Sequence, residues 1–344
     1  MTSHTVLVSG ATGFVGLHTV IQLLQAGHIV RGTLRSPGRE VEVRDSVARH
    51  VDANERLSLH QCDLTSDDGW SEAITGCDYV LHVASPFIIG TPKHEDDLII
   101  PARDGALRVL RAAAKANVKR TVMTSSVAAV SAGHSRDAAR IFNEDDWSIV
   151  NSPAIGAYEK SKTIAERAAW DFIKSDGAGM ELAVINPGAI LGPILNADSG
   201  TSGELVRQLM VRAMPACPRI GFSCVDVRDV ASAHLSAMTI PAAAGKRFVC
   251  AIEFSWMVEI AKILDENFRE RGYKIPTSEL PNWVPRIMQH FNPVLKQIIP
   301  SLGKRRDYNN AQIKSVLNWK PRSLKEMSIS MAESMIEFGV VGNK

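Results

Sequence analysis

The sequence predicts an α/β fold: a doubly wound parallel sheet with a smaller, discontinuous C-terminal lobe. Short apolar segments such as 5–9, 79–84 and 120–124 alternate with longer segments whose apolar residues recur at helical intervals. The first of these segments runs directly into a glycine-rich turn and a helix. The periodicity changes beyond Pro193, and a further strand-like segment follows at 247–251. We therefore assign residues 1–190 to a sheet domain with a returning strand near 247–251, and residues 191–344 mainly to a second lobe.

The turn after the first strand contains Gly10, Gly13 and Gly16. Gly10 allows a sharp turn, Gly13 omits a β-carbon where backbone approaches an anion, and Gly16 permits close packing of helix on strand. The N-terminus of the following helix is then directed at a bound phosphate. This arrangement is typical of the Rossmann fold and predicts a dinucleotide site. The other turn residues expected to touch the dinucleotide are Thr12, Phe14 and Val15.

The composition argues against several kinds of partner. Of the 344 residues, 45% are hydrophobic, and 39 basic side chains face 37 acidic ones, so neither nucleic acid nor a membrane surface is expected. No leader precedes the first strand and no run of about 18 apolar residues could span a bilayer, so we expect a cytoplasmic protein. The five cysteines form no C-x-x-C pair, which disfavours disulfides and a metal site. We expect a monomer or homodimer that acts on a small molecule.

The end of the predicted second strand, residues 29–35, distinguishes the two nicotinamide cofactors. About 20 residues past the glycine turn, an acidic residue would bind the free 2′-hydroxyl of NAD. No acid stands there, and Arg35 and Arg39 offer charge and donors suited to a 2′-phosphate. We therefore predict NADP, used as NADPH. The alternative is an ordinary solvated basic turn.

The third strand, at 57–61, is followed by Asp63 and Leu64. A carboxylate just past the end of such a strand could accept a hydrogen bond from the adenine amino group. The alternative is that Asp63 caps the helix near Trp70.

The fourth strand begins at Tyr79 and breaks at Val83-Ala84-Ser85, on the cofactor side of the predicted sheet. His82 lies inside this apolar run without ligand-type residues nearby. A histidine in that setting is expected to belong to the core rather than to a metal site.

The fifth strand ends in three hydroxyl residues, Thr124, Ser125 and Ser126. Its carboxyl end is expected to open onto the ligand crevice. Tyr158 and Lys162 follow at the start of a predicted helix, one turn apart and therefore on one face. Such a pair alone could be an ordinary helix surface, but together with the glycine turn and the serines it indicates a reaction centre.

Taken together, these motifs resemble those of the extended short-chain dehydrogenases/reductases, in particular the dihydroflavonol 4-reductase and aldehyde reductase group. The resemblance covers nearly the whole chain. It rests on Gly10-x-x-Gly13-x-x-Gly16, Asp63-Leu64, His82-Val83-Ala84-Ser85-Pro86, Thr124-Ser125-Ser126, Tyr158-x-x-Ser161-Lys162, Asn186-Pro187-Gly188-Ala189-Ile190 and Val225-Asp226-Val227-Arg228-Asp229.

The resemblance implies a role for each residue of the reaction centre. Tyr158 would be the proton donor, Lys162 the ribose anchor and pKa modifier, and Ser126 the hydrogen-bond donor to the carbonyl. Pro187, Gly188 and Ile190 would complete the cofactor site. Cinnamoyl-CoA reductases of this group carry an aromatic and cysteine-rich string before the tyrosine, whereas residues 154–157 read Ala-Ile-Gly-Ala. A CoA thioester is therefore disfavoured as substrate.

Elementary electrostatics supports the tyrosine–lysine pair independently. A free tyrosine has a pKa near ~10 and holds its proton too tightly for exchange at neutral pH. A lysine charge at ~4 Å in an effective dielectric of ~20 contributes roughly 4 kcal/mol, equivalent to about three pKa units. We expect Lys162 to lower the pKa of Tyr158 accordingly.

Residues near this centre predict a mainly apolar substrate pocket that includes Phe87, Val127 and Ile194. The sequence is best interpreted as an NADPH-dependent carbonyl reductase, reversible as an alcohol dehydrogenase. One alternative is an NAD-dependent sugar-nucleotide epimerase or dehydratase of the same fold. Another is a cofactor-sensing protein without turnover, which would not need Ser126, Tyr158 and Lys162 together.

Overall fold

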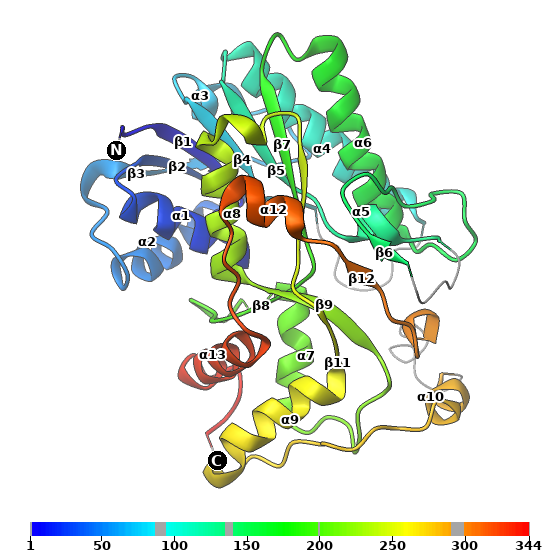
Figure 1. Cartoon of the computed structure of the whole chain (residues 1–344). Helices are drawn as coiled ribbons and strands as arrows, with labels where there is room; N and C mark the ends of the chain where they lie inside the picture. The colour runs from blue at the N-terminus through cyan, green and yellow to red at the C-terminus, as the bar shows by residue number, and fades with distance from the viewer. Residues whose placement is uncertain (1, 87–93, 135–139, 199, 290–298, 344) are drawn as a thin grey trace.

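The computed structural model describes residues 2–86, 94–134, 140–198, 200–289 and 299–343. Within them lies a seven-stranded sheet of order β10-β7-β5-β4-β1-β2-β3 (Figure 1). Its strands are β1 Thr5–Ser9, β2 Ile29–Leu34, β3 Leu57–Gln61, β4 Tyr79–His82, β5 Arg120–Thr124, β7 Glu181–Pro187 and β10 Arg247–Cys250. All neighbouring strands are parallel. The predicted doubly wound parallel fold is confirmed.

Helices cover both faces of this sheet (Figure 1). One face carries α1 Phe14–Gln25, α2 Glu40–Ala48, α8 Val227–Thr239 and α12 Ala311–Leu317; the other carries α3 Trp70–Ile74, α4 Asp96–Lys115 and α6 Ala157–Asp176. Strand β1 explains the arrangement, because Val6 and Val8 pack under the helices of one face and Leu7 packs under those of the other face. Alternate side chains point to opposite faces, so a strand buried on both must be apolar throughout.

The strand order reverses between β1 and β4, which are paired neighbours with Ser9 opposite His82. Strands β2 and β3 continue on one side of β1, and β5, β7 and β10 on the far side of β4. The carboxyl ends of parallel strands form a crevice at such a reversal, and ligands of doubly wound sheets bind there. The glycine turn follows β1 directly, so it lies at this crevice.

A second core lies beyond the carboxyl edge of the sheet, in the lower half of Figure 1. Strand β7 passes through Gly188 into β8 Ala189–Leu191, which pairs with β9 Gly221–Asp226; β9 pairs in turn with β11 Phe254–Trp256. The helices α7 Gly200–Met210, α9 Met257–Phe268 and α13 Leu324–Glu337 pack on these strands. Strand β10 lies between β9 and β11 in the chain but belongs to the large sheet, so the lobe is built from separate stretches.

Short elements complete the structure. They are α5 Ala128–Ser131, α10 Trp283–Met288 and the 3-10 helices Pro37–Arg39, Asn54–Arg56, Pro241–Ala243, Arg269–Arg271 and Ile299–Ser301. Strand β12 Asp307–Tyr308 pairs with β6 Ile141–Phe142. The Asn309 N–H then donates to the Phe142 carbonyl at 2.8 Å. This pairing holds the segment before β12 against the sheet domain, beside the crevice.

The motif at residues 225–229 joins the lobes rather than forming the site. Asp226 caps α8, accepting from the Arg228 N–H at 2.8 Å. Asp229 accepts from the Arg322 N–H at 2.6 Å and pairs with the Arg322 guanidinium. The Trp319 indole donates to the Asp229 carbonyl at 3.1 Å. These bonds fix the chain that leads from the sheet domain into α13.

Candidate active site

The glycine turn forms a tight loop with an open helix end. Gly10 has φ +72°, and a β-carbon there would lie 3.0 Å from the Ala84 Cβ. A β-carbon on Gly16 would lie 2.0 Å from the Gly10 carbonyl oxygen, so only glycine lets α1 pack so closely on β1. At Gly13 the nearest atom is 3.5 Å away, an ordinary contact, and no side chain caps α1 there. The N–H groups of this helix end remain available for an anion.

The basic residues after β2 differ in how they are held. Arg35 follows the last residue of β2 and is exposed. Arg39 donates to Glu42 at 2.8 Å and to the Thr12 carbonyl at 3.3 Å, so its guanidinium lies over the glycine turn with its charge paired. Arg35 is therefore the better placed of the two for an added phosphate.

The Asp63 carboxylate closes a local turn. It accepts from the backbone N–H of Thr65 at 2.8 Å and from the Thr65 hydroxyl at 2.7 Å. These bonds, helped by nearby Arg35 and Arg108, hold the pKa of Asp63 below its usual value. The Trp70 indole donates to the Asp63 carbonyl at 2.9 Å, so the residue also anchors the start of α3.

The end of β4 is tied to the end of β1. The Ser9 hydroxyl bonds to His82 Nδ1 at 2.9 Å and accepts from the Ala84 N–H at 3.0 Å. Burial, with a contribution from Lys162, lowers the pKa of His82 to about 3, so the imidazole is neutral. The interpretation of His82 as a core histidine is confirmed. Val83 and Ser85 flank Ala84 at this strand end.

The three hydroxyl residues at the end of β5 point to different partners. Thr124 bonds to His234 Nε2 at 2.7 Å. Ser125 is buried and donates to Glu166 at 2.5 Å. The Ser126 hydroxyl accepts from the Ala128 N–H at 3.1 Å. It also interacts with the Tyr158 phenol and acts to lower the pKa of that group. Ser126 is the member of the run that meets the tyrosine.

Tyr158 and Lys162 lie on one face of α6, with the lysine ammonium 6.0 Å from the centre of the tyrosine ring. Lys162 donates to the Ser85 hydroxyl at 3.0 Å and so connects α6 to the end of β4. Burial lowers the pKa of Lys162 to about 8, and Glu166 opposes that shift. The lysine thus keeps its proton at neutral pH.

The pKa of Tyr158 differs from the sequence expectation. It is raised, because burial opposes ionisation of the phenol more strongly than the interaction with Ser126 favours it. The ammonium of Lys162 donates to Ser85, and its charge is not among the causes of the shift in the Tyr158 pKa. In this structure Lys162 does not lower the tyrosine pKa.

A buried ionic network lies beneath the site. Glu166 is 0% exposed and accepts from Arg247 of β10 at 2.5 Å. Asn186 Nδ2 donates to the same carboxylate at 2.8 Å and to the Ser126 carbonyl at 3.2 Å. The network therefore connects α6, β5, β7 and β10 directly below Ser126 and Lys162.

The end of β7 lies beside this network. The Pro187 carbonyl accepts from the Val127 N–H at 3.0 Å. A β-carbon on Gly188 would lie 1.9 Å from the Ser223 carbonyl oxygen, so glycine is required where β7 meets β9. Ile190 is partly buried and follows in β8.

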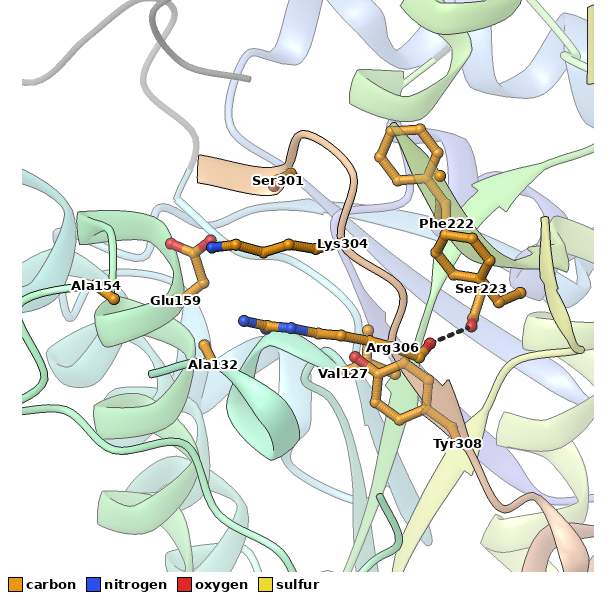
Figure 2. A pocket seen from close by; sticks show the side chains of 13 residues that line it. Val127, Ala132, Ala154, Glu159, Phe222, Ser223, Ser301, Lys304, Arg306 and Tyr308 are labelled. Atoms are coloured by element: carbon orange, nitrogen blue, oxygen red, sulfur yellow. Dashed lines mark hydrogen bonds between the residues drawn. The ribbon is translucent and has the colours of Figure 1, made fainter. Parts of the chain in front are cut away.

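A cavity of about 170 Å³ adjoins the site (Figure 2). Val127 and Glu159, the chain neighbours of Ser126 and Tyr158, line it together with Phe222, Phe254, Arg306 and Tyr308. Ile194, expected in the pocket, is instead 1% exposed in the second core, where its N–H donates to Ser334. Phe87 lies outside the described residues.

Residues 6–251 match the NAD dependent epimerase/dehydratase family. The chain belongs to this family, that of the extended short-chain dehydrogenases/reductases. Cinnamoyl-CoA reductase 1 of Petunia hybrida is 34% identical over 290 residues, which are 83% of this chain and 84% of the relative. Anthocyanidin reductase of Vitis vinifera is 31% identical over 287 residues, 79% and 83% of the two chains.

Solved structures of extended short-chain reductases superpose on nearly the whole chain. Yeast methylglyoxal/isovaleraldehyde reductase Gre2, complexed with NADPH, has a TM-score of 0.81 and 29% identity, covering 98% of this chain and 100% of its own. Vestitone reductase from alfalfa has a TM-score of 0.75 and 26% identity, covering 98% and 99%. The named relatives are therefore reductases.

The motifs did not identify three charged residues at the site, namely Glu166, Arg247 and Arg306. Glu166 stands one turn after Lys162, which was a signal for a partner on the same helix face. Arg247 and Arg306 carried no such signal, because only the folded chain brings them to the site. Within the described chain no cluster of three or more metal-ligating side chains is found, and no helix has the length and apolarity to cross a bilayer.

Proposed function

We propose that this protein is an NADPH-dependent carbonyl reductase, reversible as an alcohol dehydrogenase. The observation that carries the proposal is the meeting of the Ser126 and Tyr158 hydroxyls beside a cavity, with Lys162 one helical turn away. These side chains lie at the carboxyl edge of the sheet that also carries the glycine turn. A reduction needs a proton donor at that place.

The residues of the crevice fit a nicotinamide dinucleotide phosphate. The uncapped N-terminus of α1 suits the pyrophosphate, and Arg35 suits the 2′-phosphate. The Gre2 relative, solved with NADPH, supports the same assignment. We also assign contacts with this cofactor to Val83, Ala84, Ser85, Pro187, Gly188 and Ile190. NADPH, when bound, supplies the hydride to the carbonyl carbon.

The chain's own residues then orient and protonate the carbonyl oxygen. Ser126 donates a hydrogen bond to it, and one such donor commonly contributes about a hundredfold in rate. Tyr158 transfers its proton to the same oxygen. Lys162 stays charged at neutral pH, and we assign its ammonium to the ribose of the cofactor. Glu166 and Arg247 hold the lysine's helix and the Ser126 strand in place.

The proposal is tested with purified protein and a panel of aldehydes and ketones, each assayed with NADPH and with NADH. Loss of absorbance at the reduced nicotinamide band, matched by alcohol formation, supports it. Absence of NADPH consumption with every carbonyl compound contradicts it.

We expect Arg35→Asp to lower the preference for NADPH over NADH by about 10- to 100-fold. The variant loses a charge-assisted hydrogen bond, usually worth about 1.5–3 kcal/mol, and places a carboxylate near the 2′-phosphate. The ratio of kcat/KM with NADPH to kcat/KM with NADH measures this preference. Most of the change should be in the KM for NADPH. Arg111→Asp makes the same charge change on the exposed surface of α4 and should leave the ratio as it is. An unchanged ratio in Arg35→Asp would show that Arg35 does not bind the phosphate.

A further inference from the structure

The cavity beside Ser126 and Tyr158 is separate from the cofactor crevice. No residue of the glycine turn, of the Arg35 loop or of 83–85 lines it. It is enclosed by residues next to the reaction centre and by the segment that leads into β12. Its volume of about 170 Å³ is well below the ~300–1,000 Å³ of pockets for drug-sized ligands. The cavity therefore suits a small substrate.

The lining of this cavity combines apolar and charged side chains. Val127, Phe222 and Phe254 form the apolar part. Lys304 and Arg306 extend into the cavity from the segment before β12, and the Lys304 ammonium points toward Glu159 (Figure 2). With two cations and one carboxylate among the lining residues, the excess charge is positive.

The Arg306 guanidinium has N–H donors available for a ligand. Its guanidinium donates to the Ser131 hydroxyl at 3.3 Å, and that hydroxyl is also bound by the Tyr308 hydroxyl at 2.6 Å. Across the described residues no carboxylate oxygen is within 4.0 Å of it, although the side chain is half-buried. The Arg306 carbonyl accepts from Ser223 at 3.2 Å, which fixes the backbone. A held, half-buried guanidinium with unused donors is complementary to an oxyanion.

We propose that the substrate is a small carbonyl compound with an oxyanion at its far end, and that Arg306 binds this group. This inference rests on the proposed reductase function and deepens it. The carbonyl would lie at Ser126 and Tyr158, the body of the substrate against Phe222 and Phe254, and the anion at Arg306. A carboxylate and a phosphate monoester both match the guanidinium, and the experiment distinguishes them. The sequence predicts a mainly apolar substrate, and this proposal adds one anionic group to it.

The test compares acids with their neutral esters in kcat/KM. The probes are 4-oxobutanoate and 4-carboxybenzaldehyde, each with its methyl ester, and 4-formylphenyl phosphate. The wild type should prefer the anionic members by about 10- to 100-fold, mainly through KM, because the anion is bound equally in ground and transition states. Arg306→Met should lower kcat/KM about 10- to 100-fold more for the acids than for their esters, and Arg306→Lys should keep part of the preference.

Arg305→Met is the matched control, because Arg305 is exposed, pairs with Asp307 at 2.6 Å and does not line the cavity. It should leave the preference unchanged. Equal turnover of acids and esters by the wild type, or an equal loss for both in Arg306→Met, would overturn the inference. A preference for the phosphate over the carboxylates would support the oxyanion site and identify its ligand.

A binding measurement separates this inference from the proposed function. Calorimetric titration of 4-methylbenzoate, which cannot be reduced, into protein with NADP should show binding that Arg306→Met weakens by about 10- to 100-fold. If no carbonyl compound consumes NADPH but this binding is seen, the reductase function fails and the anion site stands. If carbonyl compounds are reduced and 4-methylbenzoate binds no better to the wild type than to Arg306→Met, the anion site fails alone.

Discussion

Tyr158→Phe is expected to lower kcat by about two to four orders of magnitude while NADPH still binds. The substitution keeps the ring on α6 but removes the proton that the carbonyl oxygen must receive. The Ser126 hydroxyl loses its partner but remains a donor. Steady-state turnover measures the loss, and titration of nicotinamide fluorescence measures cofactor affinity.

Tyr79→Phe serves as the control. It removes a phenolic hydroxyl at the start of β4, whereas the candidate site lies at the carboxyl ends of the strands. It should retain turnover. Ser126→Ala should be impaired by about a hundredfold, since one donor to the oxygen is lost. Full activity in Tyr158→Phe would exclude the tyrosine as proton donor.

Arg247→Met is expected to reduce the free energy of unfolding by about 3–5 kcal/mol. Glu166 is 0% exposed, and Arg247 is its ionic partner at 2.5 Å. Removing the arginine leaves a charge buried without compensation. Arg247 also donates to the carbonyls of Glu144 and Asp146, so part of the loss comes from these bonds. Urea unfolding followed by circular dichroism measures the change.

The double variant Glu166→Gln with Arg247→Met separates the two contributions. The glutamine is uncharged but can still accept from Ser125, so this protein should be more stable than Arg247→Met alone. Arg44→Met breaks an exposed pair with Glu40 and should cost less than about 1 kcal/mol. If the double variant were less stable than Arg247→Met, burial of an unpaired charge would not be the cause.

The fold and many of the residues at the crevice could be predicted from the sequence, because both follow from local patterns. Apolar strands, glycines at fixed spacing and hydroxyls at strand ends are each visible within a few residues. Gly10 and Gly16 hold the conformations that their spacing predicted. The resemblance assigned the carbonyl contact to Ser126, whereas the neighbouring Ser125 hydroxyl donates to Glu166.

What the sequence could not supply depends on long-range packing. Arg247 reaches Glu166, 81 positions earlier in the chain, only because β10 returns beside β7. Arg306 reaches the cavity because β12 pairs with β6. Ile194 was expected in the pocket, but its N–H donates to Ser334 of α13 and its side chain packs in the second core. The raised pKa of Tyr158 likewise reflects burial that one-turn spacing does not disclose.

The most direct test of carbonyl reduction by this protein follows deuterium from the nicotinamide to the product. Purified protein is incubated with an aldehyde and NADPH deuterated at the transferable position of C4. We predict one deuterium on the carbinol carbon of each alcohol formed, and one NADPH consumed per alcohol. The contradictory result would be NAD retained after extensive dialysis, interconversion of sugar nucleotides without added cofactor, and no net consumption of NADPH. That outcome would establish an epimerase in place of a reductase.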